Sequence, residues 1–581
     1  MPVDRREFLR WSAAGAGAMA LPRMGRAAEQ QDGRGPNVIV IITDDQGYGD
    51  MGCHGNPLIR TPHMDRLHAQ SARLTDFHVS PTCSPTRAAL MTGRHKLRTG
   101  VWHTIMGRSL LARDEVTMAD LFRMSGYRTG IFGKWHLGDN YPFRPQDRGF
   151  EEVFIHGGGG VGQTPDYWGN DYFDDTYFHN GEWKQQEGYC TDVWFDGALR
   201  FIEANRDRPF FAYVTTNAPH SPYQVPDNYR EVYADADISD SVARFYGMIT
   251  NIDDNLGRLR KRLRELDLER DTILVFLTDN GSSSPHFNAG MRAQKGSMYD
   301  GGHRVPCFIR WPGHIDGGYD VNRLTRHYDL LPTLADICGL ERPDGLAWSG
   351  RSLRPLLRGK DDSWPERVSV VDSQRVEKPQ KWRRCAVMTD RWRLVNGKEL
   401  YDINEDPGQQ NNIADEHPEV VGELREEYSR WWEDASDRFD EYCRIVLGSE
   451  NENPARLTCH DWHEPEGRIP WNQGLVRRRT DSNGFWAVHV LQDGQYSIEL
   501  RRFPREADMA INAEPENGEG INPQEARLAI GGVDQTKPVP EGAKGVSFDV
   551  QLAAGDTRLR TWLKGPEGSR GAYYVYVRRL S

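Results

Sequence analysis

The sequence lacks several features that would assign it to specialised protein classes. Its eight cysteines include no Cys-x-x-Cys pair, which argues against zinc ribbons and thioredoxin-like dithiol chemistry. Beyond residue 28, no segment is long and apolar enough to cross a membrane as a helix, so we predict no membrane span. The formal net charge of −12 argues against nucleic acid and anionic membrane surfaces as partners. With 38% hydrophobic and 27% charged residues, the chain has the composition of a globular protein of about two to four domains.

The first residues have the features of an export signal. Residues 4–10 resemble a twin-arginine export motif, a weakly apolar stretch of small residues follows over 11–21, and Ala27 and Ala28 offer a cleavage site. We therefore predict a twin-arginine-type signal peptide over residues 1–28 and an exported, periplasmic or extracellular protein. The alternative is an ordinary tail that happens to contain two arginines. Such cargo usually folds in a reducing compartment before export, so we assume no disulfides.

Short apolar runs rich in β-branched residues alternate with helical patterns along the first half of the chain. The runs lie at 37–42, 128–132, 210–214 and 272–277, and helical patterns lie at 117–124 and 241–268. This alternation predicts an α/β fold with a mostly parallel central sheet flanked by helices. Ligands bind such folds outside the carboxyl ends of the strands.

Polar residues follow each of the four predicted strands. They are Asp44 and Asp45, then Lys134 with His136, then His220, and finally Asp279 with Asn280. Loops are polar in general, so any one of these groups could be an ordinary loop. That explanation accounts less well for carboxylates, lysine and histidines together at four strand ends. The sequence therefore predicts one site to which four strand ends contribute.

Two of these groups offer oxygen ligands to a metal ion. Asp44, Asp45, Asp279 and Asn280 form an all-oxygen set, which suits hard cations such as Ca²⁺ or Mg²⁺. Taken singly, Asp-Asp and Asp-Asn-Gly are more often turn residues than ligands. Together they predict a cation site.

The segment Cys83-Ser84-Pro85-Thr86-Arg87 is the most informative part of the sequence, and it continues through Gly93 and Arg94. Pro85 suits the first turn of a helix, so Cys83 is expected just before a helix N-terminus, where anions are favoured. Arg87 offers a planar fork to oxyanions. A lone buried cysteine is the simpler interpretation. A cysteine phosphatase is another, but that signature has five residues between cysteine and arginine, and here there are three.

With its continuation, this segment resembles the signature of type I sulfatases in the alkaline phosphatase superfamily. The resemblance implies that Cys83 is converted to formylglycine by a maturation enzyme. It also implies one divalent ion, usually Ca²⁺ with Mg²⁺ as the alternative, at Asp44, Asp45, Cys83, Asp279 and Asn280. The sister alkaline phosphatases use zinc with histidines, and these ligand groups contain no histidine.

The same resemblance implies roles for further residues. Lys134 and His136 are expected to surround the nucleophile, His220 to protonate the leaving alcohol, and Lys295 to bind the sulfate and the leaving oxygen. The motif around Lys295 departs from the usual glycine-richer version. The cations would neutralise the sulfate charge during transfer.

The second half of the chain predicts two further units. Strands at 392–395 and 399–401 around Asn396-Gly397 form a hairpin, a helix follows over 418–432, and the sulfatase resemblance extends over about residues 36–440. Beyond it, short alternating strands at 485–491, 495–501, 546–552, 557–563 and 572–578 predict a β-sandwich. Trp462, Trp471, Trp486 and Trp562 are candidates for stacking on sugars, although such residues are more often core. We predict a catalytic domain at 36–365, a subdomain at 370–445 and an accessory β-domain at 450–581.

The function predicted is that of an exported sulfatase acting on sulfate monoesters, with sulfated carbohydrates as the favoured substrates. The loop of residues 156–160 and the aromatic segment 167–177 are expected to shape the substrate pocket. One alternative is a formylglycine-type phosphodiesterase or phosphonate hydrolase. Another is a catalytically silent carbohydrate-binding protein. The sugar, the sulfate position and the oligomeric state are left open.

Overall fold

The computed structural model describes residues 35–360, 364–464 and 466–581 of the chain. The predicted signal peptide over residues 1–28 lies outside the described residues. In the part that is described, no helix is both long and apolar enough to cross a membrane.

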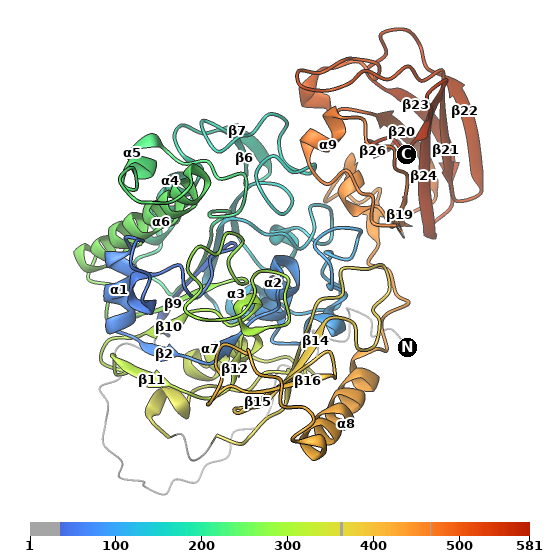
Figure 1. The fold of residues 1–581 in the computed structure, drawn as a ribbon. Helices are drawn as coiled ribbons and strands as arrows, with labels where there is room; N and C mark the ends of the chain where they lie inside the picture. The colour runs from blue at the N-terminus through green and yellow to red at the C-terminus, as the bar shows by residue number, and fades with distance from the viewer. Residues whose placement is uncertain (1–34, 361–363, 465) are drawn as a thin grey trace, which may run out of the picture. The chain divides into compact units, whose positions relative to one another are not determined.

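A ten-stranded sheet forms the centre of the fold (Figure 1). From edge to edge its strands are β11 (Tyr319–Val321), β2 (Ala72–Leu74), β10 (Cys307–Arg310), β9 (Thr272–Thr278), β1 (Asn37–Thr43), β8 (Phe210–Thr215), β4 (Arg128–Gly133), β5 (Glu152–Ile155), β6 (Thr176–His179) and β7 (Glu182–Gln185). β1 pairs in parallel with β8 and β9, and β4 pairs in parallel with β8 and β5. β10, β6 and β7 add antiparallel pairs. The predicted α/β class with a mostly parallel central sheet is confirmed.

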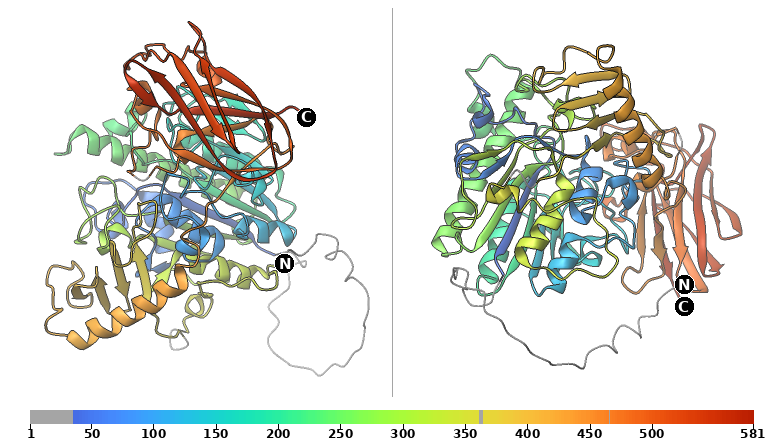
Figure 2. Two further views of the ribbon diagram at one scale, coloured as in Figure 1. Left: turned by 90° about the vertical axis from the view of Figure 1, so that its right-hand side faces the viewer. Right: turned by 90° about the horizontal axis from the view of Figure 1, so that it is seen from below.

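Alternate residues of β1 point to opposite faces of this sheet, as a pleated strand requires. Val38, Val40 and Ile42 join one hydrophobic cluster, whereas Ile39 and Ile41 join another. The first cluster is covered by α2 (Cys83–Thr92), α3 (Met118–Met124) and α7 (Leu330–Cys338), and the second by α1 (Pro62–Ala69), α4 (Cys190–Ala204) and α6 (Asp240–Glu265). Helices therefore flank the sheet on both faces (Figure 2).

The helix that carries Cys83 begins at that residue. Thr82 before it is extended, Pro85 lies in the first turn, and Gly93 ends the helix with a φ of 66°. The sequence placed Cys83 just before the helix, and the structure makes it the first helical residue. All residues of α2 are buried, so this helix N-terminus is enclosed by protein.

A four-stranded antiparallel sheet with one helix follows. Its strands are β13 (Ser369–Asp372), β14 (Cys385–Met388), β15 (Trp392–Val395) and β16 (Glu399–Asp402), and its helix is α8 (Pro418–Ala435). The hairpin between β15 and β16 turns at Asn396 and Gly397, both with positive φ, as predicted. Val387, Leu394 and Leu424 join the hydrophobic cluster between sheet and helix.

Two more sheets form the C-terminal part of the chain and share one hydrophobic cluster. One contains β17 (Ile445–Leu447), β19 (Phe485–Val490), β24 (Gly555–Gly565), β21 (Glu525–Ile530), β22 (Val533–Pro538) and β25 (Gly568–Arg570). The other contains β18 (Ala455–Thr458), β26 (Tyr574–Arg579), β20 (Gly494–Arg501) and β23 (Val546–Leu552). The predicted strands match β19, β20, β23, β24 and β26. The domain boundaries stay predictions.

The burial of the tryptophans corrects part of the sugar-stacking prediction. Trp462 and Trp486 are completely buried in the shared C-terminal cluster, so they are core residues and cannot stack on a sugar. Trp562 is half-buried under the guanidinium group of Arg527. Of the four, Trp471 keeps an exposed face, at 37%.

Candidate active site

The predicted polar residues meet at the carboxyl edge of the central sheet. Asp44 and Asp45 follow β1, Lys134 follows β4, and Asp279 follows β9, and these strands lie next to or near one another in the sheet. Because parallel strands end at the same edge, their first loop residues share one location. The N-terminus of α2 brings Cys83 to the same place, where Asp44, Cys83 and Asp279 offer ligand atoms within 4.8 Å of one another.

The carboxylates of this cluster are crowded and incompletely paired. Asp44 Oδ1 and Asn280 Oδ1 are buried and have no hydrogen-bond partner in the described structure. Burial and the neighbouring Asp44 raise the pKa of Asp279 to about 7. Oxygen atoms that are buried, close together and unpaired fit a hard divalent cation. Such an ion would offset the repulsion between the carboxylates and give the unpaired oxygens a partner.

Two buried cations hold the inner side of the cluster. Arg87 donates to Asp279 Oδ2 from Nη2 at 2.8 Å and from Nε at 3.1 Å. Lys134 Nζ lies 2.6 Å from Asp44 Oδ2. Despite burial, the carboxylate of Asp279 raises the pKa of Arg87, so this guanidinium stays charged.

Cys83 is 3% exposed and is not activated as a thiol. Burial raises the pKa of Cys83, although Lys134 and Lys295 act in the opposite direction. A thiol that keeps its proton is a poor nucleophile. The unmodified side chain is therefore poorly suited to attack, although it sits at the centre of the site.

The outer side of the site is built on Asp45, which has a left-handed φ of 68°. Its Oδ1 contacts Lys295 Nζ at 2.5 Å and accepts from Asn280 Nδ2 at 2.9 Å. Its Oδ2 lies 3.8 Å from His220 Nε2. Burial alone would raise the pKa of Asp45, but Lys295 and His220 hold it well below its usual range. The side chains of Lys295 and His220 are 21% and 13% exposed, so both reach the surface.

The protonation of the two site histidines follows from their partners. His220 Nδ1 lies 2.6 Å from the carbonyl of Ser221, which can only accept, so Nδ1 carries a proton. Burial lowers the pKa of His220 to about 4. His136 Nε2 likewise donates to the Thr104 carbonyl at 2.8 Å, and burial lowers the pKa of His136 well below its usual value. His136 Nδ1 therefore keeps its lone pair, buried and without a described partner.

The glycine run over residues 157–160, which follows His156, is a packing feature of this site. A Cβ on Gly159 would lie 2.2 Å from Cε1 of the His136 ring, so any larger residue there would have to displace that ring. Gly157 is similarly confined, because a Cβ would lie 2.4 Å from the Pro165 carbonyl oxygen. In the aromatic segment, the Tyr172 hydroxyl donates to the His220 carbonyl at 3.0 Å. Both predicted pocket segments therefore contact site histidines.

The sequence interpretation missed two residues near the site. Thr215, the last residue of β8, accepts from Arg87 and donates to the Lys134 carbonyl at 3.0 Å. Its position at a strand end could have identified it. His460 comes from the C-terminal part of the chain, is 1% exposed, and places its ring 6.1 Å from that of His136. No local pattern in the sequence predicts that contact.

Known proteins match much of the chain. The family model described as Sulfatase matches residues 36–340, and the one described as N-sulphoglucosamine sulphohydrolase, C-terminal, matches residues 292–433. Arylsulfatase A of Homo sapiens is 30% identical over 467 residues, covering 70% of this chain and 90% of the relative. N-acetylgalactosamine-6-O-sulfatase of Bacteroides thetaiotaomicron is 29% identical over 496 residues, covering 68% and 93%. The crystal structure of Ps i-CgsB in complex with k-i-k-neocarrahexaose superposes with a TM-score of 0.64 at 27% identity, over 70% of this chain and 95% of that one.

Proposed function

This chain belongs to the sulfatase family, the type I sulfatases of the alkaline phosphatase superfamily, and from that premise we propose its substrate class and mechanism. The resemblance inferred from the Cys83 segment is confirmed, and the chain is a sulfuric ester hydrolase. We propose that it hydrolyses sulfate monoesters of carbohydrates with residue 83 as formylglycine. The observation that carries this proposal is the convergence of Arg87, Lys134 and Lys295 with buried carboxylates around Cys83.

Two groups complete the proposed site. A hydrated aldehyde at position 83 supplies one hydroxyl to attack sulfur and a second whose deprotonation expels sulfate. A divalent cation, Ca²⁺ or alternatively Mg²⁺, supplies positive charge opposite the sulfate. Asp44, Asp45, Asp279 and Asn280 would hold the cation together with residue 83. The unpaired oxygens of Asp44 and Asn280 support this assignment.

The chain's own residues would then divide the work. Arg87 orients Asp279, and Lys134 orients Asp44 and adds positive charge. His136 Nδ1, which keeps a lone pair, would accept a proton from a hydroxyl of residue 83. The Nδ1 atom of His136 is buried and has no hydrogen-bond partner among the described residues, which supports this role.

The outer residues would act on the leaving group. Lys295 would bind the sulfate and the bridging oxygen, and His220 would protonate the departing alcohol. A bound sulfate would favour the protonated imidazole, because an anion opposes the effect of burial on its pKa. The partial exposure of both side chains supports contact with substrate.

Carbohydrate is the proposed leaving group because of the relatives and the neighbouring structure. One relative is an N-acetylgalactosamine-6-O-sulfatase, and the structure of Ps i-CgsB contains k-i-k-neocarrahexaose. We also propose export by the twin-arginine-type signal and modification by a formylglycine-generating maturation enzyme. The catalytic domain would span residues 36–365, with a subdomain at 370–445 and an accessory domain at 450–581.

The experiment compares matched esters with the matured full-length protein. Turnover is measured on a panel of sulfated oligosaccharides and on paired nitrophenyl sulfate and phosphate esters, with Cys83→Ala as the control. We expect Cys83-dependent release of sulfate from at least one oligosaccharide and a preference for the sulfate ester. Faster phosphate hydrolysis would instead establish a phosphodiesterase or phosphonate hydrolase. Binding of oligosaccharide without turnover would establish a binding protein.

A further inference from the structure

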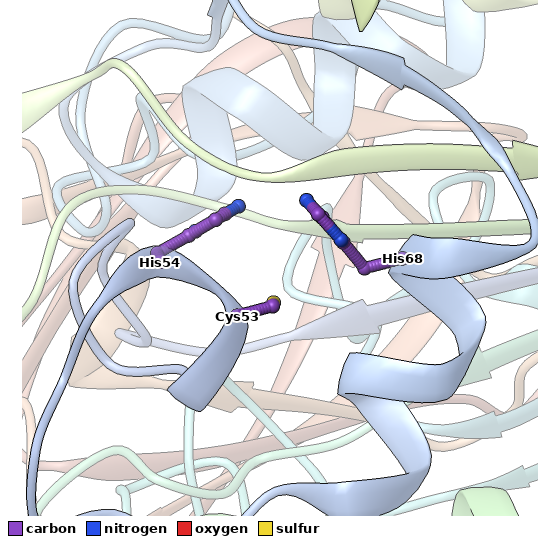
Figure 3. A group of neighbouring side chains, drawn as sticks. All are labelled: Cys53, His54 and His68. Carbon is purple, nitrogen blue, oxygen red and sulfur yellow. The ribbon is translucent and has the colours of Figure 1, made fainter. Parts of the chain in front are cut away.

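A second group of metal-ligating side chains lies outside the proposed active site. Cys53, His54 and His68 offer one sulfur and two nitrogen atoms that lie within 4.8 Å of one another (Figure 3). Cys53 and His54 belong to the short helix η1 (Gly52–His54), and His68 lies in the last turn of α1. The three side chains point toward a common space between η1 and α1 (Figure 3). The sulfatase mechanism uses none of them.

The surroundings of His54 hold it in the tautomer that a metal ligand needs. Its Nδ1 lies 2.7 Å from the Tyr48 carbonyl oxygen, which can only accept, so Nδ1 carries the proton and Nε2 keeps its lone pair. The ring also stacks on Tyr48, with centroids 3.8 Å apart and planes 8° apart. A histidine that ligates a metal usually donates its other N–H to a carbonyl or carboxylate in this way.

The helix α1 fixes the other two ligands relative to each other. Asp65, three residues before His68, accepts from the backbone N–H of Cys53 at 2.8 Å and from the Thr61 hydroxyl at 3.1 Å. These bonds hold η1 against the same helix that carries His68. The group is half-buried, so an ion has a route from solvent.

The two histidines are in the protonation state that metal binding needs, whereas the cysteine would have to lose its proton. Burial lowers the pKa of His54 to about 4 and lowers that of His68, so both imidazoles are neutral and can donate a lone pair. Burial and Asp65 raise the pKa of Cys53, so the free thiol keeps its proton and an ion would displace it. Arg73 and Arg304 add nearby positive charge that opposes a cation, whereas Asp65 and Asp320 add negative charge that favours one.

We propose that Cys53, His54 and His68 bind a Zn²⁺ ion, with a water molecule in the fourth position. A thiolate and two imidazoles suit zinc, whereas the oxygen cluster of Asp44 and Asp279 suits calcium or magnesium. The ion would tie the segment that follows Asp45 to α1 and stabilise it. The competing interpretation is a purely aromatic cluster, since Phe308 also packs edge-on against both histidine rings at 5.9 and 5.2 Å.

Co²⁺ is the probe that distinguishes these interpretations, because a thiolate ligand gives it a charge-transfer absorption in the near ultraviolet. Full-length protein is stripped with a chelator, titrated with Co²⁺ and then with Zn²⁺. Wild type and a Cys83→Ala variant are compared, so that a signal from the active-site thiol is recognised. We expect a thiolate absorption that corresponds to one Co²⁺ per chain in both proteins, beside any Co²⁺ bound at the oxygen cluster, and this absorption should be abolished by Zn²⁺ but not by Ca²⁺.

Substitutions of the ligands then test the assignment. Cys53→Ser should abolish the charge-transfer absorption, and His54→Ala and His68→Ala should each weaken Co²⁺ binding by more than the ~10–100-fold typical of losing a second-shell partner. Cys338→Ser and His314→Ala are the controls, because Cys338 is partly buried and His314 is exposed. Both variants should keep the charge-transfer absorption and the Co²⁺ affinity. Circular dichroism checks that each variant folds. Absence of the absorption in the wild type, or its persistence in Cys53→Ser, would overturn the proposal.

Discussion

The two sides of the active site differ in how firmly they are held. On the inner side, the side chains of Arg87, Lys134 and Asp279 are at most 1% exposed, and each is paired with a partner in the same network. On the outer side, Lys295 and His220 are 21% and 13% exposed and share the single carboxylate of Asp45. In the proposed mechanism, the inner side holds the nucleophile, which is the same for every substrate. In the same proposal, Lys295 and His220 on the outer side act on the leaving group, which differs from one substrate to another.

The largest effect is expected on the inner side, at the nucleophile. Cys83→Ser should reduce kcat by the order of 10⁶-fold on every substrate, because we expect a cysteine-specific maturation enzyme, which would leave serine unconverted. The fold should be unchanged, since the hydroxyl is nearly isosteric with the thiol. Steady-state kinetics and circular dichroism measure the two quantities. Substantial activity in purified Cys83→Ser, once contaminating enzyme is excluded, would remove the formylglycine hypothesis.

Asp279→Ala should be nearly as damaging, because it removes a proposed cation ligand and the partner of Arg87. We expect loss of bound Ca²⁺ or Mg²⁺, a loss of activity beyond ~10²–10³-fold, and a loss of about 3–5 kcal/mol in unfolding free energy. Elemental analysis and thermal unfolding measure these effects, and chelation of the wild type should reproduce the loss of activity.

The matched control for this variant is Asp336→Ala. Asp336 also pairs with an arginine, Arg354 at 2.8 Å, but both side chains are about two-fifths exposed. Its loss should lower the unfolding free energy by about 1 kcal/mol or less and leave the cation bound. Cys53→Ser should likewise keep Ca²⁺ or Mg²⁺. A variant lacking Asp279 that still binds the cation stoichiometrically would refute the oxygen-ligand assignment.

On the outer side, the loss should depend on the leaving group. His220→Ala should lower kcat for hydrolysis of a sulfated sugar by ~10²–10⁴-fold, because a sugar alkoxide is strongly basic and needs a proton as it departs. A nitrophenolate leaves without one, so nitrophenyl sulfate should be slowed much less. The kcat of the variant on both substrates gives the comparison. Equal proportional losses would reject the acid role for His220 and transfer it to Lys295.

A smaller effect is expected where the glycine run touches the inner side. Gly159→Ala should displace the His136 ring and reduce kcat by ~10²-fold on sugar and nitrophenyl esters alike. Gly422→Ala is the control, because this helical glycine of α8 has open space around it. It should leave kcat unchanged and stabilise the fold by about 1 kcal/mol. A loss in Gly159→Ala confined to sugar substrates would place this loop on the outer side instead.

The sequence predicted most residues of the site from the ends of strands, and it lacked such a signal for the others, for a physical reason. Asp44, Lys134 and Asp279 each follow an apolar run that forms a central parallel strand, and such strands end at one edge of the sheet. Lys295 lies in an irregular loop with no periodic signal, so only the family resemblance pointed to it. His460 reaches His136 through tertiary packing, which no local pattern encodes.

The C-terminal sheets were predicted in part, and alternation along the strands explains only some of the outcome, since β21 alternates and was still missed. β20 and β23 alternate buried and exposed side chains along much of their length, whereas β22 is polar and mostly exposed, so it has no such pattern. The sequence did not indicate which of its C-terminal tryptophans are buried. In the structure, Trp462 and Trp486 are core residues.

Catalysis by formylglycine is tested most directly by measuring the chemical state of residue 83 together with activity. Protein is produced with varying amounts of the maturation enzyme, and mass spectrometry of the peptide containing residue 83 gives the fraction that carries an aldehyde. We expect kcat for sulfate release to rise in proportion to that fraction and to vanish when Cys83 is unmodified. Full activity in protein whose Cys83 is entirely unmodified would contradict this expectation.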